Sequence, residues 1–225
     1  MINIYALSDL HGLLLEKEFF EETVDLVLIC GDVSPLKIQA NDRKMKKWLL
    51  EEFTLWANSL PCEKVLFIAG NHDWFFSRNP IKAHDMFPTN SKITYLQDNL
   101  YEYKKEDKIY RIYGTPWCKV FYNWAFMLQD PYLKDIYDKI PYNLDILLTH
   151  EQPYGIGDVI TAEHLGSVPL LKAIEEKQPR YLFTGHLHST DHSCLQIKDT
   201  KRYNVSILDE EYNLKYFPER LNLNI

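Results

Sequence analysis

The sequence lacks the features of a secreted, membrane-spanning or disordered protein. Its four cysteines show no CxxC spacing, so we interpret them as free thiols in a reducing compartment. The first residues carry no basic segment and lead directly into an apolar run, which is not the pattern of a signal peptide. No apolar run approaches the roughly 20 residues that cross a bilayer. We therefore expect a soluble, cytoplasmic protein without a membrane partner.

An excess of basic residues is also absent, because the formal net charge is -7. This argues mildly against duplex binding and makes a long nucleic acid an unfavoured partner. Apolar residues make up 46% and charged residues 25%, an ordinary globular composition. We find no repeat, low-complexity segment or linker, so residues 1–225 are predicted to form a single domain. The oligomeric state stays open.

The chain alternates apolar runs with segments of helical periodicity, which predicts an α/β fold. Buried strands are expected at 2–7, 24–30, 65–69, 144–149 and 181–184, and shorter antiparallel strands between 93 and 113 with a turn at 106–107. Helices are expected at about 13–22, from 41 or 42 to 58, from 131 onward and over 170–177. The tail segments 193–197, 202–208 and 212–217 alternate and indicate a β-meander.

Each of the five apolar strands ends in a cluster of polar residues. Open α/β sheets place binding sites beyond the carboxyl ends of their strands. Any one cluster alone would more often be a turn. The five together predict one site, and five of the eight histidines lie in them: Asp9-Leu10-His11, Gly31-Asp32, Gly70-Asn71-His72-Asp73, His150 and Gly185-His186-Leu187-His188.

The donor types in these clusters point to hard or borderline cations. Carboxylate, amide and imidazole ligands without cysteine suit Mn²⁺, Fe²⁺/³⁺ or Zn²⁺. The available groups exceed what one ion binds, and they fit two ions about 3.5–4 Å apart that share a carboxylate. Within the third cluster, Asn71 offers a neutral oxygen ligand, His72 a nitrogen or a mobile proton, and Asp73 a carboxylate that could orient the imidazole.

The five blocks, in this order, resemble those of the calcineurin-like metallophosphoesterases over about residues 1–210. Two further stretches, Gly114-Thr115-Pro116-Trp117 with Asn123-Trp124-Ala125-Phe126 and the segment 149–158, are similar to a narrower group within that family. These are small brain-expressed metallophosphoesterase-domain proteins, which are described as phosphodiesterases. The resemblance implies an α/β, four-layer αββα sandwich of two mixed β-sheets flanked by helices.

The resemblance also assigns metal ligands. It implies that two metal ions bind, with Asp32 as the ligand that both ions share. Its two ligand sets are Asp9, His11 and His188 for one ion, and Asn71, His150 and His186 for the other.

His72 and Asp73 are the catalytic residues that the resemblance implies. His72 would contact the phosphate and protonate the leaving alkoxide, and Asp73 would orient the His72 ring. Many family members carry Glu at the position of Asp73, and the shorter side chain puts its reach to His72 in question. The expected reaction is hydrolysis of a small or nucleotide phosphodiester by a hydroxide that bridges the two metals.

Two alternatives accompany this prediction. One is a phosphomonoesterase or nuclease of the same fold, and the other is a metal-binding scaffold without catalysis. The segment 31–37, Gly-Asp-Val-Ser-Pro-Leu-Lys, departs from the Gly-Asp-X-X-Asp-Arg-Gly of the protein Ser/Thr phosphatases of this superfamily, which weakens that assignment.

Several residues near the motifs have an ordinary structural interpretation. The aromatic residues of loop 115–127 are expected to pack rather than to form a base-stacking platform. Arg78 is expected at the surface, and Trp74 is as suited to packing as to lining a pocket. The loops 115–127 and 151–169 are expected to determine substrate specificity.

Overall fold

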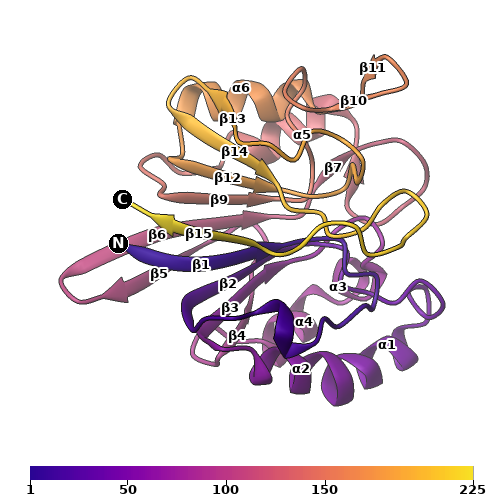
Figure 1. Ribbon diagram of the computed structural model, residues 1–225. Helices are drawn as coiled ribbons and strands as arrows, with labels where there is room; N and C mark the ends of the chain where they lie inside the picture. The colour runs from indigo at the N-terminus through magenta and orange to yellow at the C-terminus, as the bar shows by residue number, and fades with distance from the viewer. Residues whose placement is uncertain (225) are drawn as a thin grey trace.

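The computed structural model describes residues 1–224 and contains two large β-sheets packed face to face (Figure 1). The first sheet has the order β15-β1-β2-β3-β4. Strands β1 to β4 are parallel, and β15 is antiparallel to β1. Their bounds are Ile2–Leu7 (β1), Val24–Cys30 (β2), Cys62–Ile68 (β3), Ile93–Tyr95 (β4) and Glu219–Leu223 (β15).

The second sheet has the order β13-β14-β12-β9-β6-β5 and is also mixed. Its four inner strands are parallel, whereas each outer strand is antiparallel to its neighbour. The bounds are Asn99–Lys105 (β5), Lys108–Thr115 (β6), Ile146–Thr149 (β9), Tyr181–Thr184 (β12), Leu195–Ile197 (β13) and Thr200–Asn204 (β14).

The apolar strands are buried on both faces, which explains their continuous hydrophobic sequence. Successive side chains of a strand point to opposite faces. In β1, Ile4 and Ala6 enter the core between the two sheets, whereas Tyr5 and Leu7 face the helices of the first sheet. The inter-sheet core is therefore built from alternate residues of each inner strand.

Helices cover the outer face of each sheet, so the predicted four-layer αββα architecture is confirmed (Figure 1). The first sheet is covered by α1 (Asp42–Trp48), a π-helical segment (Leu49–Phe53), α2 (Thr54–Ser59), α3 (Trp74–Arg78) and α4 (Pro80–Met86). The second is covered by α5 (Asp130–Tyr137) and α6 (Val168–Lys177). Asn41 begins α1 as predicted, because its Oδ1 accepts a hydrogen bond from the backbone N–H of Lys44.

Two expectations about secondary structure were wrong. The segment expected as a helix at 13–22 contains only a 3₁₀ turn, Lys17–Phe19, and the Leu15 carbonyl there accepts a hydrogen bond from the Trp56 indole. In the tail, 212–217 forms no strand. The last strand is β15, which crosses to β1 and covers an otherwise open sheet edge, with Leu223 buried between the sheets.

Two short pairs of strands extend the loops beyond the second sheet. They are β7 (Cys118–Lys119) with β8 (Met127–Leu128), and β10 (Val159–Ile160) with β11 (Glu163–His164). In residues 1–224, we find no helix with the length and apolar character needed to span a membrane. The compartment and the single-domain organisation stay predictions.

Candidate metal centre

The structure brings the polar ends of strands from both sheets together at one edge of the sandwich. Asp9 follows β1, and its Oδ1 lies 3.3 Å from Nε2 of His188, which follows β12. Asp32 follows β2, and its Oδ2 lies 3.3 Å from Nε2 of His150, which follows β9. The polar strand ends therefore converge as predicted, and the site that they form contains residues from both sheets.

The backbone at these strand ends takes an uncommon conformation. Four of the predicted metal ligands are non-glycine residues with positive φ, a region that few such residues occupy. The turns that this conformation produces let residues spaced i and i+2 face the same point, which a regular strand does not allow. Such strain concentrates at functional sites. The four are Asp9 (φ 58°), His11 (43°), Asp32 (52°) and His186 (70°).

Two glycines let the strand ends approach each other closely. A Cβ atom on Gly70 would overlap Asp32 Oδ1 and lie 2.6 Å from His150 Nε2. A Cβ atom on Gly185 would overlap Ser8 Oγ and lie 2.6 Å from Asp9 Oδ2. Any larger residue at either position would displace a carboxylate of the site.

Asp9, His11 and His188 form the first group that could hold a metal, with ligand atoms within 4.8 Å of one another. The side chain of His11 is almost completely buried, and neither of its ring nitrogens has a hydrogen-bond partner among the described residues. A buried imidazole without a partner is costly unless another ligand satisfies it. His188 donates Nδ1–H to the Asp209 carbonyl (2.9 Å), which leaves Nε2 facing the group. This donor set fits a metal ion.

Asp9, Asp32 and His150 form a second group within the same distance limit. His150 donates Nδ1–H to the Cys30 carbonyl (2.7 Å), and its Nε2 lies 3.0 Å from Asn71 Oδ1. The structure thereby brings Asn71 into the site. Asp32 Oδ2 is 3.3 Å from His150 Nε2 and 3.6 Å from His11 Nε2, so this carboxylate lies between the two groups.

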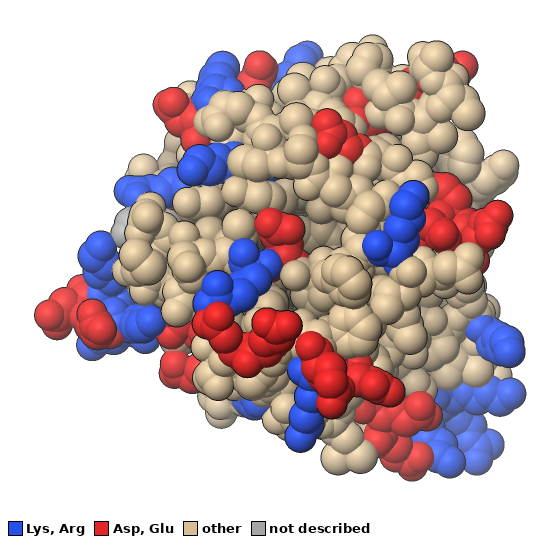
Figure 2. Space-filling view, in the orientation of Figure 1, with Lys and Arg blue, Asp and Glu red and all other residues tan. Residues whose placement is uncertain are grey.

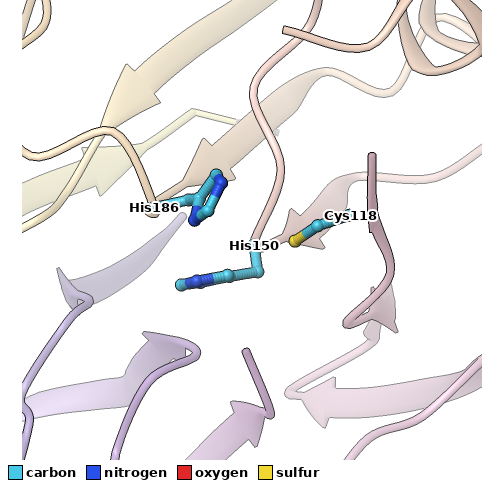
Figure 3. Close-up of side chains that lie close together, drawn as sticks. All are labelled: Cys118, His150 and His186. Atoms are coloured by element: carbon cyan, nitrogen blue, oxygen red, sulfur yellow. The ribbon is translucent and has the colours of Figure 1, made fainter. Parts of the chain in front are cut away.

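A third group contains a cysteine that sequence reasoning left out. Ligand atoms of Cys118, His150 and His186 lie within 4.8 Å of one another. Figure 3 shows the sulfur beside the base of the His150 side chain, with the imidazole extending away from it. Burial raises the pKa of the Cys118 thiol, which favours its neutral form. No motif spacing could have indicated this contact, because Cys118 belongs to none of the five blocks.

The charges of the site favour a cation between the carboxylates. Burial alone would lower the pKa of His150, but Asp32 and then Asp9 raise it to about 10. Likewise, burial opposes the charge of His188, but Asp9 raises its pKa to about 9. In the ion pairs of the described residues, Asp9 and Asp32 are paired with histidines only. Protonated His150 and His188 thus balance the charge of the two carboxylates, and bound divalent cations would supply the same countercharge.

The two other ligand histidines are held neutral. Burial lowers the pKa of His11 to about 4. Burial, together with the neighbouring His150, lowers the pKa of His186 to about 3. A neutral imidazole presents the lone pair that a metal ion requires, so both residues suit the ligand role.

Among the described residues, we find no contact of the Asp73 carboxylate with the His72 ring, which the resemblance had implied. The Asp73 carboxylate accepts hydrogen bonds from the backbone N–H groups of Gly70 (2.8 Å), Ser34 (2.9 Å) and Val33 (3.3 Å). The short side chain is fully buried and points toward the segments that follow β2 and β3, because the backbone N–H groups there need an acceptor. Asp73 therefore holds together the backbone that follows β2 and β3.

His72 lies at the edge of the site and contacts a residue that sequence reasoning missed. Its Nδ1 is 2.8 Å from Gln39 Oε1, in the loop between β2 and α1. Its backbone N–H donates to Asp32 Oδ1 (2.8 Å), and its ring contacts that of Trp124 at a centroid distance of 4.3 Å, with the two planes tilted by 41°. His72 belongs to none of the three candidate ligand groups found among the described residues.

A cavity of about 620 Å³ opens beside the site. Asn71, His72, His186 and His188 line one side of it. The opposite walls come from loop 115–127, from loop 151–169 and from Tyr212, whose ring meets that of His11 at 4.8 Å. Both loops that were expected to determine specificity thus border the cavity.

The aromatic residues of loop 115–127 divide into two sets. Trp117 and Phe126 pack edge to face at 5.3 Å and contact the core, as expected. The packing prediction is wrong for Phe121, Tyr122 and Trp124, which line the cavity. Phe121 and Tyr122 are 66% and 67% exposed, so a ligand could reach both rings.

Arg78 and Trp74 lie outside the cavity. Arg78 is exposed, pairs with Asp42 at 3.3 Å and donates to the Ala40 carbonyl at 3.1 Å. Its guanidinium lies over the Trp74 ring at 4.6 Å. The surface role predicted for Arg78 is confirmed, and Trp74 takes the packing role.

Comparison with known proteins gives a consistent result. Residues 2–190 match the sequence profile of the family described as calcineurin-like phosphoesterase. The chain is 31% identical over 184 residues to metallophosphoesterase domain-containing protein 1 of Homo sapiens, covering 73% of this chain and 54% of that protein. It is 34% identical over 145 residues to the UPF0046 protein T07D4.2 of Caenorhabditis elegans, covering 63% and 35%. The chain thus spans about half the length of the human relative and about a third of the nematode protein.

Solved structures show the same fold. The crystal structure of TT1561 of Thermus thermophilus has a TM-score of 0.58 at 15% identity, covering 90% of this chain and 88% of that one. The structure titled phosphopantetheinyl hydrolase from Mycobacterium tuberculosis has a TM-score of 0.55 at 12% identity, covering 91% and 89%. At these identities the likeness concerns the fold alone.

Proposed function

The chain belongs to the calcineurin-like phosphoesterase family, and we propose that it is a binuclear metal-dependent phosphodiesterase acting on a small diester. One observation carries the proposal. Asp32 lies between two groups of potential ligands, while His72 borders the same site and belongs to neither group. A shared carboxylate between two ions and a histidine free to carry a proton are the two requirements of this chemistry.

The proposed ligand assignment is the one that the resemblance implies, and its first set coincides with the first observed group. The proposed shared ligand is Asp32. The proposed ions are Mn²⁺, Fe²⁺/³⁺ or Zn²⁺, because oxygen and imidazole donors suit these cations. When bound, the two ions would lower the pKa of a water and neutralise the phosphate oxygens. The proposed ligand sets are Asp9, His11 and His188 for one ion, and Asn71, His150 and His186 for the other.

His72 is the proposed general acid. Its Nδ1 is engaged by Gln39, so its Nε2 is the nitrogen left to exchange a proton with the substrate. Transfer of that proton to the leaving oxygen would avoid the release of an unstable alkoxide. The ring also contacts that of Trp124, and both residues line the cavity.

The cavity favours a small substrate of low charge. Among the lysines and arginines of the described residues, only Lys119 lines it, whereas Glu151 and Glu210 contribute acidic groups. A diester carries one negative charge, while a monoester carries up to two and a polyphosphate or nucleic acid more. The aromatic walls formed by Phe121, Tyr122 and Trp124 suit an apolar or flat ester group.

The surface charge agrees with a small substrate. On the face shown in Figure 2, Lys and Arg side chains are interspersed with Asp and Glu and form no continuous basic surface. A long nucleic acid would require a row of cations to contact its phosphates. We therefore propose a small phosphodiester as the partner.

Paired chromogenic substrates test this proposal. With added Mn²⁺, bis(p-nitrophenyl) phosphate should be hydrolysed with a higher kcat/KM than p-nitrophenyl phosphate. The two substrates share their leaving group, so the comparison isolates the second ester group. A preference for the monoester would overturn the diester assignment, and hydrolysis of neither by metal-loaded protein would overturn the enzyme assignment.

A further inference from the structure

The side chain of Gln39 forms a hydrogen bond with Nδ1 of the His72 imidazole. The Oε1–Nδ1 distance is 2.8 Å, and a carbonyl oxygen can only accept. Nδ1 therefore carries a hydrogen. In the described residues, Gln39 is the only hydrogen-bond partner of the His72 ring, whose other neighbours are the Trp124 and His11 rings.

The loop that carries Gln39 is fixed to the element that carries His72. The Ala40 carbonyl, one residue after Gln39, accepts a hydrogen bond from Arg78 Nη1. Arg78 ends α3, the helix that begins at Trp74, two residues after His72. Arg78 also pairs with Asp42 at the start of α1. The loop that carries the acceptor and the segment that carries the imidazole are thus linked through the same short helix.

Asp73, the partner of His72 that the resemblance implies, binds other groups. Asp73 accepts three backbone hydrogen bonds and has no contact with the His72 ring among those of the described residues. A carboxylate at the position of the Gln39 amide would add a negative charge beside a cavity proposed to take an anionic phosphoester. A neutral amide orients the ring without that repulsion.

We propose that Gln39 is a positioning residue that fixes the tautomer and the orientation of His72, so that Nε2 faces the bound phosphoester. This inference rests on the proposed function, because the orientation of His72 affects the reaction only if His72 donates a proton to the leaving group. Gln39 itself touches no reacting atom. It acts through His72. Its loss should therefore change the tautomer and orientation of the imidazole and leave KM unchanged.

The first test is spectroscopic and requires no turnover. In Zn²⁺-loaded protein labelled with ¹⁵N at histidine, two-bond ¹H–¹⁵N correlations of neutral His72 should report the Nδ1–H tautomer. Gln39→Leu should give a mixture of tautomers, and Gln39→Glu, which keeps an acceptor, should restore the Nδ1–H form. Gln196→Leu is the matched control, because Gln196 is an exposed glutamine on β13. An unchanged tautomer in Gln39→Leu would overturn the proposal.

The second test separates positioning from a merely structural role. Gln39→Leu should lower kcat about tenfold on a diester with an alkyl leaving group, the effect of losing one hydrogen bond of ordinary strength. KM should stay unchanged, as should kcat on a nitrophenyl ester, which needs no proton. Equal losses on both substrates would overturn the proposal. If the wild-type protein hydrolyses no diester, the proposed function fails, while the tautomer comparison still decides the role of Gln39.

Discussion

Asp32 and His150 come from different sheets, and Asp32 Oδ2 lies 3.3 Å from His150 Nε2. Asp32 follows β2 of the first sheet, and His150 follows β9 of the second. The contact ties the two layers of the sandwich at the edge where all five polar clusters meet. The proposed centre therefore depends on the packing of the sheets as well as on its own side chains.

Replacing Asp32 by Asn should weaken the binding of both ions. The amide keeps the size of the side chain but removes the charge that both ligand groups share, so we expect at least about a tenfold loss of metal affinity. Elemental analysis after dialysis measures it. Asp107→Asn, in the exposed β5–β6 turn, is the control and should retain full metal content. Loss of one ion only would contradict a shared position.

Replacing His72 by Gln should slow hydrolysis in a way that depends on the leaving group. General acid catalysis contributes roughly 10²–10⁴-fold, so kcat on an alkyl ester should fall by about 100-fold or more. On a nitrophenyl ester the loss should be small, and metal content should not change. His84→Gln, outside the site, is the control. Equal losses on both esters would rule out the proton-donor role.

Asp73 should matter for folding more than for catalysis. Its buried carboxylate accepts three backbone hydrogen bonds, and each unsatisfied buried donor costs about 1–3 kcal/mol. Asp73→Ala should therefore lower the free energy of unfolding by more than about 3 kcal/mol, measured by urea titration of the metal-loaded protein. Asp73→Asn, which keeps one acceptor, should lose less. A stable Asp73→Ala protein with a leaving-group-dependent defect would restore the role that the sequence suggested.

The exposed rings of the cavity should contribute to substrate binding. Phe121→Ala should raise KM for phenyl p-nitrophenyl phosphate about threefold to tenfold, the range that an aromatic contact supplies, and leave KM for methyl p-nitrophenyl phosphate unchanged. Tyr132→Ala is the control, because Tyr132 is a similarly exposed aromatic residue on α5. Equal effects on the phenyl and methyl esters would show that the ring does not contact the ester group.

The sequence could predict which strand ends meet. Parallel strands present their carboxyl ends at the same sheet edge, so polar residues after successive apolar strands converge whatever the details of packing. The convergence of Asp9 with Asp32 in the first sheet, and of His150 with His186 in the second, follows from that rule. The two-sheet arrangement came from the family resemblance, because apolar periodicity alone does not tell one sheet from two.

Other parts of the site depend on contacts between segments that share no pattern. The Asp73 carboxylate is oriented by the backbone N–H groups of Val33 and Ser34, about forty residues earlier in the chain. The sequence of the third cluster alone does not indicate these contacts. Gln39 reaches His72 from an irregular loop, and Cys118 approaches His150 from the short strand β7. Each contact is fixed by loop geometry, for which the sequence offers no periodic signal.

The binuclear centre is the central claim, and the Mn²⁺-loaded protein tests it most directly. Elemental analysis should find two Mn²⁺ ions per chain, and electron paramagnetic resonance should show the exchange-coupled spectrum of two ions bridged by a common ligand, about 3.5–4 Å apart. One ion per chain, or two with the spectra of isolated Mn²⁺, would contradict the shared position of Asp32.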